Sequence, residues 1–223
     1  MDKRYNKGQY GQDEIIDKLC YPLGKETHKG VFVEIGAWDG VDISNTYTLE
    51  KKRDWKGLLV EPIKDKAADC SHNRWYDVWR GCIYDRDGEV DFTHIRGYSE
   101  MLSCIKEDSH PYHKERIQRE ISQYNQQVET IKVPCKTINS LLNSFNIERV
   151  DILSLDVQSI ELLVLKAYNV QKNPCKVIIL DTNSINTDEI KEWFATNGYK
   201  LYWKHSVSDE YIFINHDLKW SWE

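Results

Sequence analysis

The sequence lacks the features that would assign it at once to several common classes of protein. Its six cysteines include no C-x-x-C pair, it has no proline-rich linker, and no apolar run approaches the roughly 18 residues of a membrane span. Scattered cysteines predict neither a zinc motif nor a disulfide framework, and reduced thiols are typical of a cytoplasmic protein. Because no signal peptide is recognisable, we expect neither secretion nor a membrane span.

Basic residues are also in the minority. The chain has 30 Lys and Arg against 36 Asp and Glu, which gives a formal net charge of −6. Without a basic field a protein has little means of holding a nucleic-acid backbone, so we expect no nucleic-acid partner. The 223 residues, 40% of them hydrophobic, suffice for one α/β domain over residues 1–223. Within it, the polar segment 1–11 is expected to be irregular.

Predicted strands and helices alternate through most of the chain. Apolar runs predict strands at 31–35, 57–61, 78–84, 89–94, 130–134, 151–156, 177–181, 199–204 and 210–215. Helical spacing predicts helices at 13–20, 43–52, 64–73, 137–145, 160–168 and 187–197. Thr137 is the expected N-cap of its helix. This alternation is typical of a mostly parallel sheet with helices on both faces, and the last two strands are expected to form an antiparallel hairpin.

Residues 95–129 interrupt this alternation. Ile117 and Ile121 stand at helical spacing, so the later part of the segment is expected to be an amphipathic helix. An insertion of this length is where a lid over a substrate is expected. It carries His110 and His113, which are candidate general bases because histidine titrates near neutral pH. The alternative, that both are ordinary surface histidines, stays open.

The turn after the first predicted strand is the most informative part of the sequence. Glu34 lies in the apolar run, and Gly36 and Gly40 then bracket Trp38 and Asp39. Glycine lets the backbone approach a ligand closely. A dinucleotide-binding turn needs another glycine where Trp38 stands, and Asp39 would repel a pyrophosphate. S-Adenosylmethionine (SAM) carries a sulfonium and an ammonium group and no phosphate, so this turn favours SAM over NAD.

Acidic residues stand at the ends of four predicted strands: Glu34, Glu61, Asp156 and Asp181. In an open α/β sheet, ligands bind at the carboxyl ends of the strands, which meet at one edge. The alternative for each acid is a helix cap or a solvated strand end. Glu61 is expected to accept both hydroxyls of a ribose, and the following Pro62 would fix its direction.

Asp156 ends a central predicted strand. There it could contact the methyl group to be transferred, orient an acceptor hydroxyl or bind a divalent cation. Asp181 and Asn183 come at the end of the next predicted strand. Together these oxygen atoms would suit Mg²⁺ or Mn²⁺. Hydrogen bonding within the loops is the alternative to a metal site.

Several segments together resemble one known family. They are 9–13, 32–40, 44–46, 49–50, 57–62, 73–74, 98–99, and 151–157 followed by Glu161. In order and spacing they are similar to the motifs of the FkbM-type SAM-dependent O-methyltransferases, over nearly the whole chain. Gln158 and Ser159 depart from that pattern, because the family usually has Glu and Gly there. The run 181–183 also replaces a more usual glutamate, and its acid-x-Asn pattern is similar to metal-dependent O-methyltransferases.

The resemblance implies a Rossmann-like class I methyltransferase fold with a mostly parallel seven-stranded sheet. It implies SAM contacts by Gln12, Glu34, Gly36, Asp39, Ser44, Asn45, Glu61, Pro62, Asp156 and, as the expected end of the third strand, Cys82 and Ile83. Contacts with the methyl acceptor are expected from Tyr98, Ser99, Gln158, Asp181 and Asn183. Catalysis is expected from Asp156, His110 and His113.

We therefore predict a SAM-dependent O-methyltransferase acting on a hydroxyl of a sugar in a glycan or glycoconjugate. One alternative is a non-sugar small-molecule acceptor. Another, suggested by Gln158 and Ser159, is a non-catalytic glycan-binding module that retains the fold. An NAD-linked oxidoreductase would share the fold class, but the glycine-poor turn counts against it. The sequence is also compatible with one piece of a larger glycan-assembly polypeptide.

Overall fold

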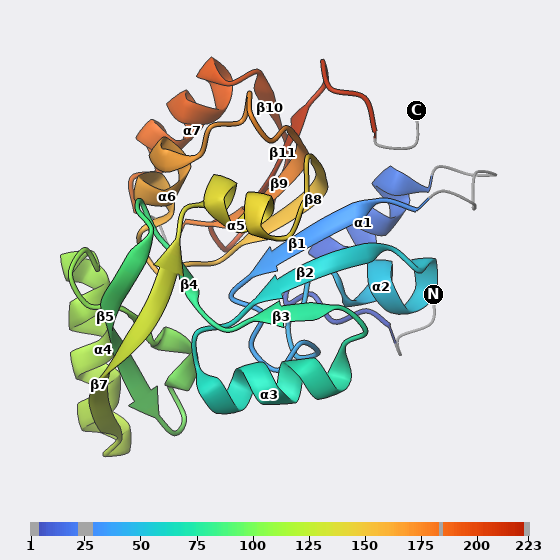
Figure 1. Ribbon diagram of the computed structural model, residues 1–223. Coiled ribbons are helices and arrows are strands. Elements are labelled where there is room, and N and C mark those ends of the chain that lie inside the picture. Colours follow the sequence, from blue (N-terminus) through green and yellow to red (C-terminus); the bar gives the residue numbers. More distant parts are fainter. Residues whose placement is uncertain (1–4, 22–28, 183–184, 221–223) are drawn as a thin grey trace.

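The computed structural model describes residues 5–21, 29–182 and 185–220, and within them seven strands form the main sheet (Figure 1). The strand order is β3-β2-β1-β8-β9-β11-β10. Strand β11 runs antiparallel to β9 and β10, and the other neighbouring pairs are parallel. The bounds are β1 Val31–Ile35, β2 Lys56–Val60, β3 Asp77–Trp79, β8 Val150–Leu155, β9 Cys175–Asp181, β10 Tyr199–Lys204 and β11 Glu210–Asn215. The predicted Rossmann-like sheet with a C-terminal hairpin is confirmed.

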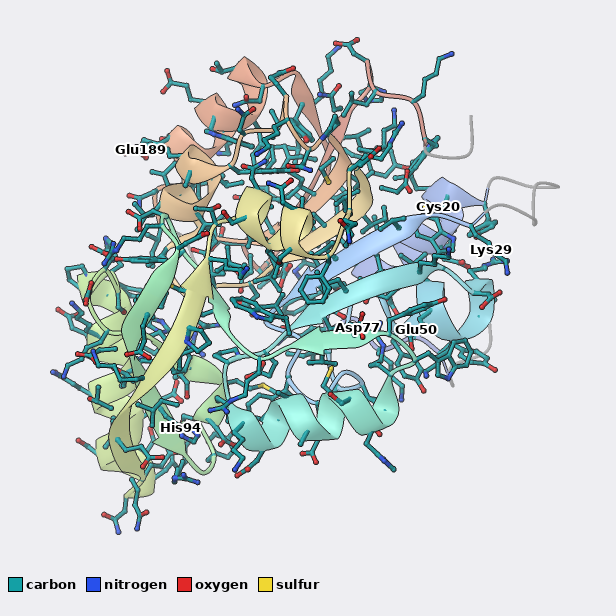
Figure 2. The ribbon with its side chains drawn as sticks, viewed as in Figure 1. Cys20, Lys29, Glu50, Asp77, His94 and Glu189 are labelled. Carbon is teal, nitrogen blue, oxygen red and sulfur yellow. The ribbon has the colours of Figure 1, made fainter. Side chains whose placement is uncertain are left out.

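Helices cover both faces of this sheet because its strands are apolar on both sides. Phe32 of β1 packs in a buried cluster with α1 (Gln12–Cys20) and α2 (Tyr47–Arg53). The cluster includes Cys20 of α1, which is labelled in Figure 2. The next residue, Val33, packs in the cluster on the other face. There the helices are α5 (Ile138–Ser144), α6 (Glu161–Ala167) and α7 (Thr187–Thr196). No helix of the described residues is long and apolar enough to cross a membrane.

A second, four-stranded sheet was not predicted. Its order is β4-β7-β5-β6, with β4 Cys82–Ile83, β5 Gly88–Arg96, β6 Cys104–Ile105 and β7 Gln127–Lys136. The prediction of one strand over 78–84 is wrong, because the chain leaves the main sheet after β3 and pairs again as β4 with β7. The break falls at Gly81, where a Cβ would lie 2.4 Å from the ring of Trp79. Cys82 and Ile83 therefore do not end the third strand.

The predicted insertion is smaller than expected, since β5 and β7 extend into it from both sides (Figure 1). Between them lie the short 3-10 helix η1 (Glu100–Leu102), β6 and α4 (Pro111–Tyr124). The predicted amphipathic helix is confirmed, because Ile117 is buried with Ile95 and Ile121 packs against the same cluster. The N-cap role of Thr137 is also confirmed, since its hydroxyl accepts from the Ser140 N–H at 3.1 Å.

Helix α3 (Lys64–Asn73) follows β2 and carries the buried Cys70 against the Phe32 face of the sheet. Its bounds are those predicted. The residue after it, Arg74, is the C-cap.

Gly57 of β2 tests how tightly the main sheet is packed. It pairs with Phe32 of β1, and an alanine Cβ there would lie 2.0 Å from ring atom Cζ. Because Phe32 is fully buried, we expect Gly57→Ala to lower the free energy of unfolding by about 1–3 kcal/mol in urea titrations. A Phe32→Leu/Gly57→Ala double variant should lose less unfolding free energy than the two single variants lose together, since leucine leaves room for the added Cβ. Strict additivity would contradict this contact.

Candidate functional site

Two adjoining cavities lie at the carboxyl edge of the main sheet. We call them the apolar and the polar cavity, and both are lined by Ile35, Gly36, Ile43 and Asp156. The apolar cavity is further lined by Trp38, Val60, Glu61, Pro62, Ile63, Gly81, Cys82, Ile83, Phe92, Glu100, Met101, Ser103, Cys104, Ile105, Val157 and Gln158. The polar cavity is further lined by Gln9, Gln12, Glu34, Ala37, Asp42, Ser44, Asn45, Ser154, Leu155, Ile179, Leu180, Asp181 and Glu210.

Gly36 lies where the two cavities meet. Its φ is +81°, and a Cβ there would lie 2.5 Å from the carbonyl oxygen of Asp156. Both the left-handed backbone and the lack of space therefore require glycine. The Gly36 and Ala37 N–H groups donate to the Val60 carbonyl, each at 3.0 Å. The turn after β1 is thus held against the ends of both β2 and β8.

Glu61 follows β2 and faces the apolar cavity. Its carboxylate accepts hydrogen bonds from the Trp38 N–H at 2.9 Å and the Ile63 N–H at 2.8 Å. Burial raises its pKa to about 8, against the effect of these two donors. The predicted contacts Pro62, Cys82 and Ile83 line the same cavity. The structure therefore brings four predicted cofactor residues together, although the reason given for the last two was wrong.

The polar cavity is acidic. Burial, and then the charge of Asp181, raises the pKa of Asp156 to about 7 and that of Glu210 to about 8. The Gln158 Nε2 donates to Asp156 Oδ1 at 2.7 Å. Among the residues that the structure describes, those that line this cavity include no lysine, arginine or histidine. The carboxyl groups of its wall make the cavity suited to a cationic group.

Ser44 and Asn45 form one wall of the polar cavity together with Glu34. Ser44 Oγ and the Asn45 N–H each donate to the Glu34 carboxylate at 2.8 Å. The Asn45 side-chain Nδ2 donates to Ser154 Oγ on β8 at 3.0 Å. Its Oδ1 is buried and has no hydrogen-bond partner among the described residues. A buried acceptor without a partner is costly, so Asn45 fits a ligand that donates a hydrogen bond.

Three predicted site residues line neither cavity. Asp39 Oδ1 accepts from the Val41 and Asp42 N–H groups, each at 2.8 Å, and so closes its own loop. Tyr98 is exposed and packs on the Tyr124 ring, with centroids 4.5 Å apart. Ser99 is buried and its hydroxyl donates to Glu120 on α4 at 2.5 Å. The residues that follow Ser99, namely Glu100 and Met101, line the apolar cavity instead.

The two predicted catalytic histidines also lie outside the lining of both cavities. His113 is buried, its Nε2 is 3.1 Å from the Leu102 carbonyl oxygen, and burial lowers its pKa. The His110 ring caps α4 by accepting from the Tyr112 N–H. The His110 N–H donates to Ser159 Oγ at 3.1 Å, which ties α4 to the loop after β8. Their roles as general bases stay predictions.

The predicted metal site gains no support from the donor set. Asn183 lies outside the described residues. Among residues 5–21, 29–182 and 185–220, no group of three or more His, Cys, Asp and Glu side chains is arranged to hold a metal ion. Asp156 and Asp181 therefore do not make a fitting site by themselves, and no step below is assigned to a metal.

Two buried acids were missed as site residues. Glu210 opens β11 and pairs with Asp181, because an antiparallel strand begins where its parallel neighbour ends. The predicted hairpin was the signal that could have found it. Glu161, quoted only as a motif residue, accepts from the Ser159 N–H at 3.1 Å and the Val157 N–H at 3.4 Å. It fixes the loop that carries Gln158 at the apolar cavity.

The order of the seven strands is that of the Rossmann-like class I methyltransferase fold. The sequence profile of the Methyltransferase FkbM domain matches residues 34–201, and the chain belongs to this family. No curated protein sequence matches it significantly.

Solved structures with a similar chain path include methyltransferase FkbM from Methylobacillus flagellatus KT, with a TM-score of 0.51 and 11% identity over 86% of this chain. This chain spans 45% of that protein's chain, less than half. A methyltransferase from Pyrococcus furiosus has a TM-score of 0.42 and 11% identity, covering 90% of this chain and 82% of its own. A SAM-dependent methyltransferase from Archaeoglobus fulgidus has a TM-score of 0.40 and 9% identity, covering 87% and 73%.

Glu161 provides a test of the burial of acids beside the site. Burial raises its pKa from 4.5 to about 8, so between these values the folded protein binds more protons than the unfolded chain. The group therefore lowers the free energy of unfolding as pH rises, by at most about 1.4 kcal/mol per pH unit. Glutamine keeps an acceptor and cannot ionise. We expect the free energy of unfolding of Glu161→Gln, measured in urea titrations, to decline less than that of the wild type between about pH 5 and pH 8.

The matched control is Glu189→Gln on α7, where the side chain is exposed (Figure 2). Its stability curve should run parallel to that of the wild type. Parallel curves for Glu161→Gln and wild type would contradict the raised pKa.

Proposed function

We propose that the chain is a SAM-dependent O-methyltransferase that transfers a methyl group to a hydroxyl of a sugar in a glycan or glycoconjugate. The observation that carries the proposal is the apolar cavity, with Glu61 in its wall, opening at Gly36 and Asp156 into an acid-lined cavity. An elongated ligand with an uncharged flat end and a cationic end matches this pair. Membership of the FkbM methyltransferase family supports the same donor.

Particular residues fit the parts of SAM. The Glu61 carboxylate would accept the ribose hydroxyls, and Cys82, Ile83 and Phe92 would pack on the adenine. In the polar cavity, Asn45 Oδ1 would accept from the ammonium group. The surrounding carboxylates favour the positive charge of the donor. NAD fits less well, because its pyrophosphate would have to lie among these acids.

Methyl transfer requires the protein mainly to align the reactants and to exclude water. When bound, SAM supplies a methyl group on a sulfonium, which is a strong electrophile. The chain must hold an acceptor oxygen in line with it and exclude water as a rival. Asp156 lies at the junction of the cavities, and its pKa of about 7 suits it to take the hydroxyl proton at neutral pH.

A sugar acceptor is supported by the chemistry around Asp156. Carboxylates and amides from Asp156, Asp181 and Gln158 supply several acceptors for neighbouring hydroxyl groups. Gln158 Oε1 is also buried without a partner among the described residues. Action in the cytoplasm, as one domain over residues 1–223 or as part of a longer glycan-assembly polypeptide, belongs to the same proposal.

Calorimetric titration with SAM and with NAD tests the choice of donor. We expect micromolar binding of SAM, no binding of NAD, and a loss of about tenfold or more in SAM affinity for Glu61→Ala, since a buried hydrogen-bonding partner of the ribose is removed. Glu189→Gln should bind as the wild type does. A folded protein that binds NAD and not SAM would overturn the proposal.

Transfer of an isotopically labelled methyl group to a panel of sugars tests the acceptor. We expect a labelled methyl ether on one sugar hydroxyl, and no product from the deoxysugar that lacks this hydroxyl. Asp156→Asn should lower the rate by about 10²–10⁴-fold while retaining SAM binding, because the proton acceptor is lost. Labelled product only from non-sugar hydroxyl compounds would refute the proposal that the acceptor is a sugar. SAM binding without any product would favour a non-catalytic module.

A further inference from the structure

Three charged side chains are buried together in and behind one wall of the polar cavity. Glu34 lies on β1, Glu50 on α2 (labelled in Figure 2), and Arg74 is the C-cap of α3. The side chains of Arg74 and Glu50 have no exposed surface, and that of Glu34 is 5% exposed. Buried charges are tolerated only where they are paired and hydrogen-bonded, so this cluster must be held closely.

Arg74 uses its planar fork to join these elements. Its Nε donates to Glu50 Oε2 at 2.9 Å, and its Nη1 donates to Glu34 Oε2 at 3.1 Å. The same Nη1 lies 3.0 Å from the Gly40 carbonyl oxygen, and Nη2 donates to Thr46 Oγ1 at 2.9 Å. One side chain therefore fixes the turn after β1, the loop before α2 and α2 itself.

Glu34 passes this constraint on to the cavity wall. One oxygen, Oε1, accepts from the Asn45 N–H, and the other, Oε2, accepts from Ser44, Thr46 and Arg74. The carboxylate is thus fully used by the protein, although it lies in the lining of the polar cavity. Its contacts are those of a support for the segment 44–46.

Asn45 is the part of this support that faces the polar cavity. Its main chain is held by Glu34 and its Nδ2 by Ser154, so the direction of its amide is set from two sides. What is left is Oδ1, buried and without a partner among the described residues, in the wall of the polar cavity. Arg74 itself lines neither cavity.

We infer that Arg74 is a positioning residue for the methyl donor, which holds Glu34 so that Asn45 Oδ1 is aimed at the ammonium group of bound SAM. Glu34 then acts as a support and not as a ligand. The inference rests on the proposed function, because it needs SAM in the polar cavity.

Two probes separate this role from a general effect on folding. SAM has the amino-acid end that Asn45 would hold, and 5′-methylthioadenosine has the same adenosine and sulfur without that end. We expect Asn45→Ala and Arg74→Met to weaken calorimetric binding of SAM by about tenfold or more. Binding of 5′-methylthioadenosine should change by less than about twofold, because the apolar cavity is left intact.

Two further variants test the coupling. In the Arg74→Met/Asn45→Ala double variant, SAM affinity should fall no further than in the weaker-binding single variant. Both substitutions remove the same contact, which is that of the Asn45 amide with SAM. Arg74→Lys keeps the charge without the fork, so its affinity should lie between those of wild type and Arg74→Met. The exposed Arg119 of α4, changed to Met, is the matched control and should bind both probes as wild type does.

The outcomes are distinct. Equal weakening of both probes in Asn45→Ala or Arg74→Met, unchanged SAM affinity, or additive losses in the double variant would each overturn the inference. If Arg74→Met does not fold, Asn45→Ala and Arg74→Lys test the inference instead. Each should weaken binding of SAM more than binding of 5′-methylthioadenosine. A wild-type chain that binds neither probe would defeat the proposed function instead, before any variant is compared.

Discussion

The close approach of Gly36 to the end of β8 is the constraint on which the rest of the site depends. Strands β1 and β8 are neighbours, and the Asp156 N–H donates to the Ile35 carbonyl at 3.1 Å. Only a residue without a Cβ lets the turn after β1 continue past this point. The two cavities share their boundary here, so a ligand that reaches from one to the other must pass Gly36 and Asp156. A geometric requirement of the backbone thereby fixes the point where the two cavities meet.

The acids around this boundary make the site costly for the fold without a ligand. Glu61, Asp156 and Glu210 all have pKa values raised by burial, and for the last two the charge of Asp181 adds to the effect. Groups that are hard to ionise in the folded chain favour either a proton or another cation. A cationic ligand relieves this repulsion, which no lysine or arginine among the described residues of the cavity wall does. Affinity for such a ligand and the free-energy cost of burying these acids therefore have the same origin.

Most of the main sheet was predictable from the sequence, because its apolar runs and helical spacings are local signals. The positions of the acids Glu61 and Asp156 at the carboxyl edge were also predictable. Each follows a recognisable strand, and parallel strands bring their carboxyl ends to one edge. The second sheet was not, because a run such as 78–84 does not reveal that the chain changes sheets at Gly81. Arg74 and Glu34 are 40 residues apart, and no local pattern reports a buried pair of that kind. A turn acid such as Asp39 can likewise close its own loop or face a ligand, and only coordinates distinguish the two.

The loop after β8 ties helix α4 to the main sheet and departs locally from ordinary backbone geometry. Gln158 and Ser159 have φ values of +53° and +84°, which side chains with a Cβ seldom adopt. Glu161 accepts from the Ser159 N–H, and Ser159 Oγ accepts from the His110 N–H, so the loop is held from both sides. Strain of this kind persists where surrounding contacts fix it, and it is common at functional sites. Here it aims Gln158 at the apolar cavity and attaches α4 beside Asp156, so the elements added to the main sheet are tied to the place where the acceptor would bind.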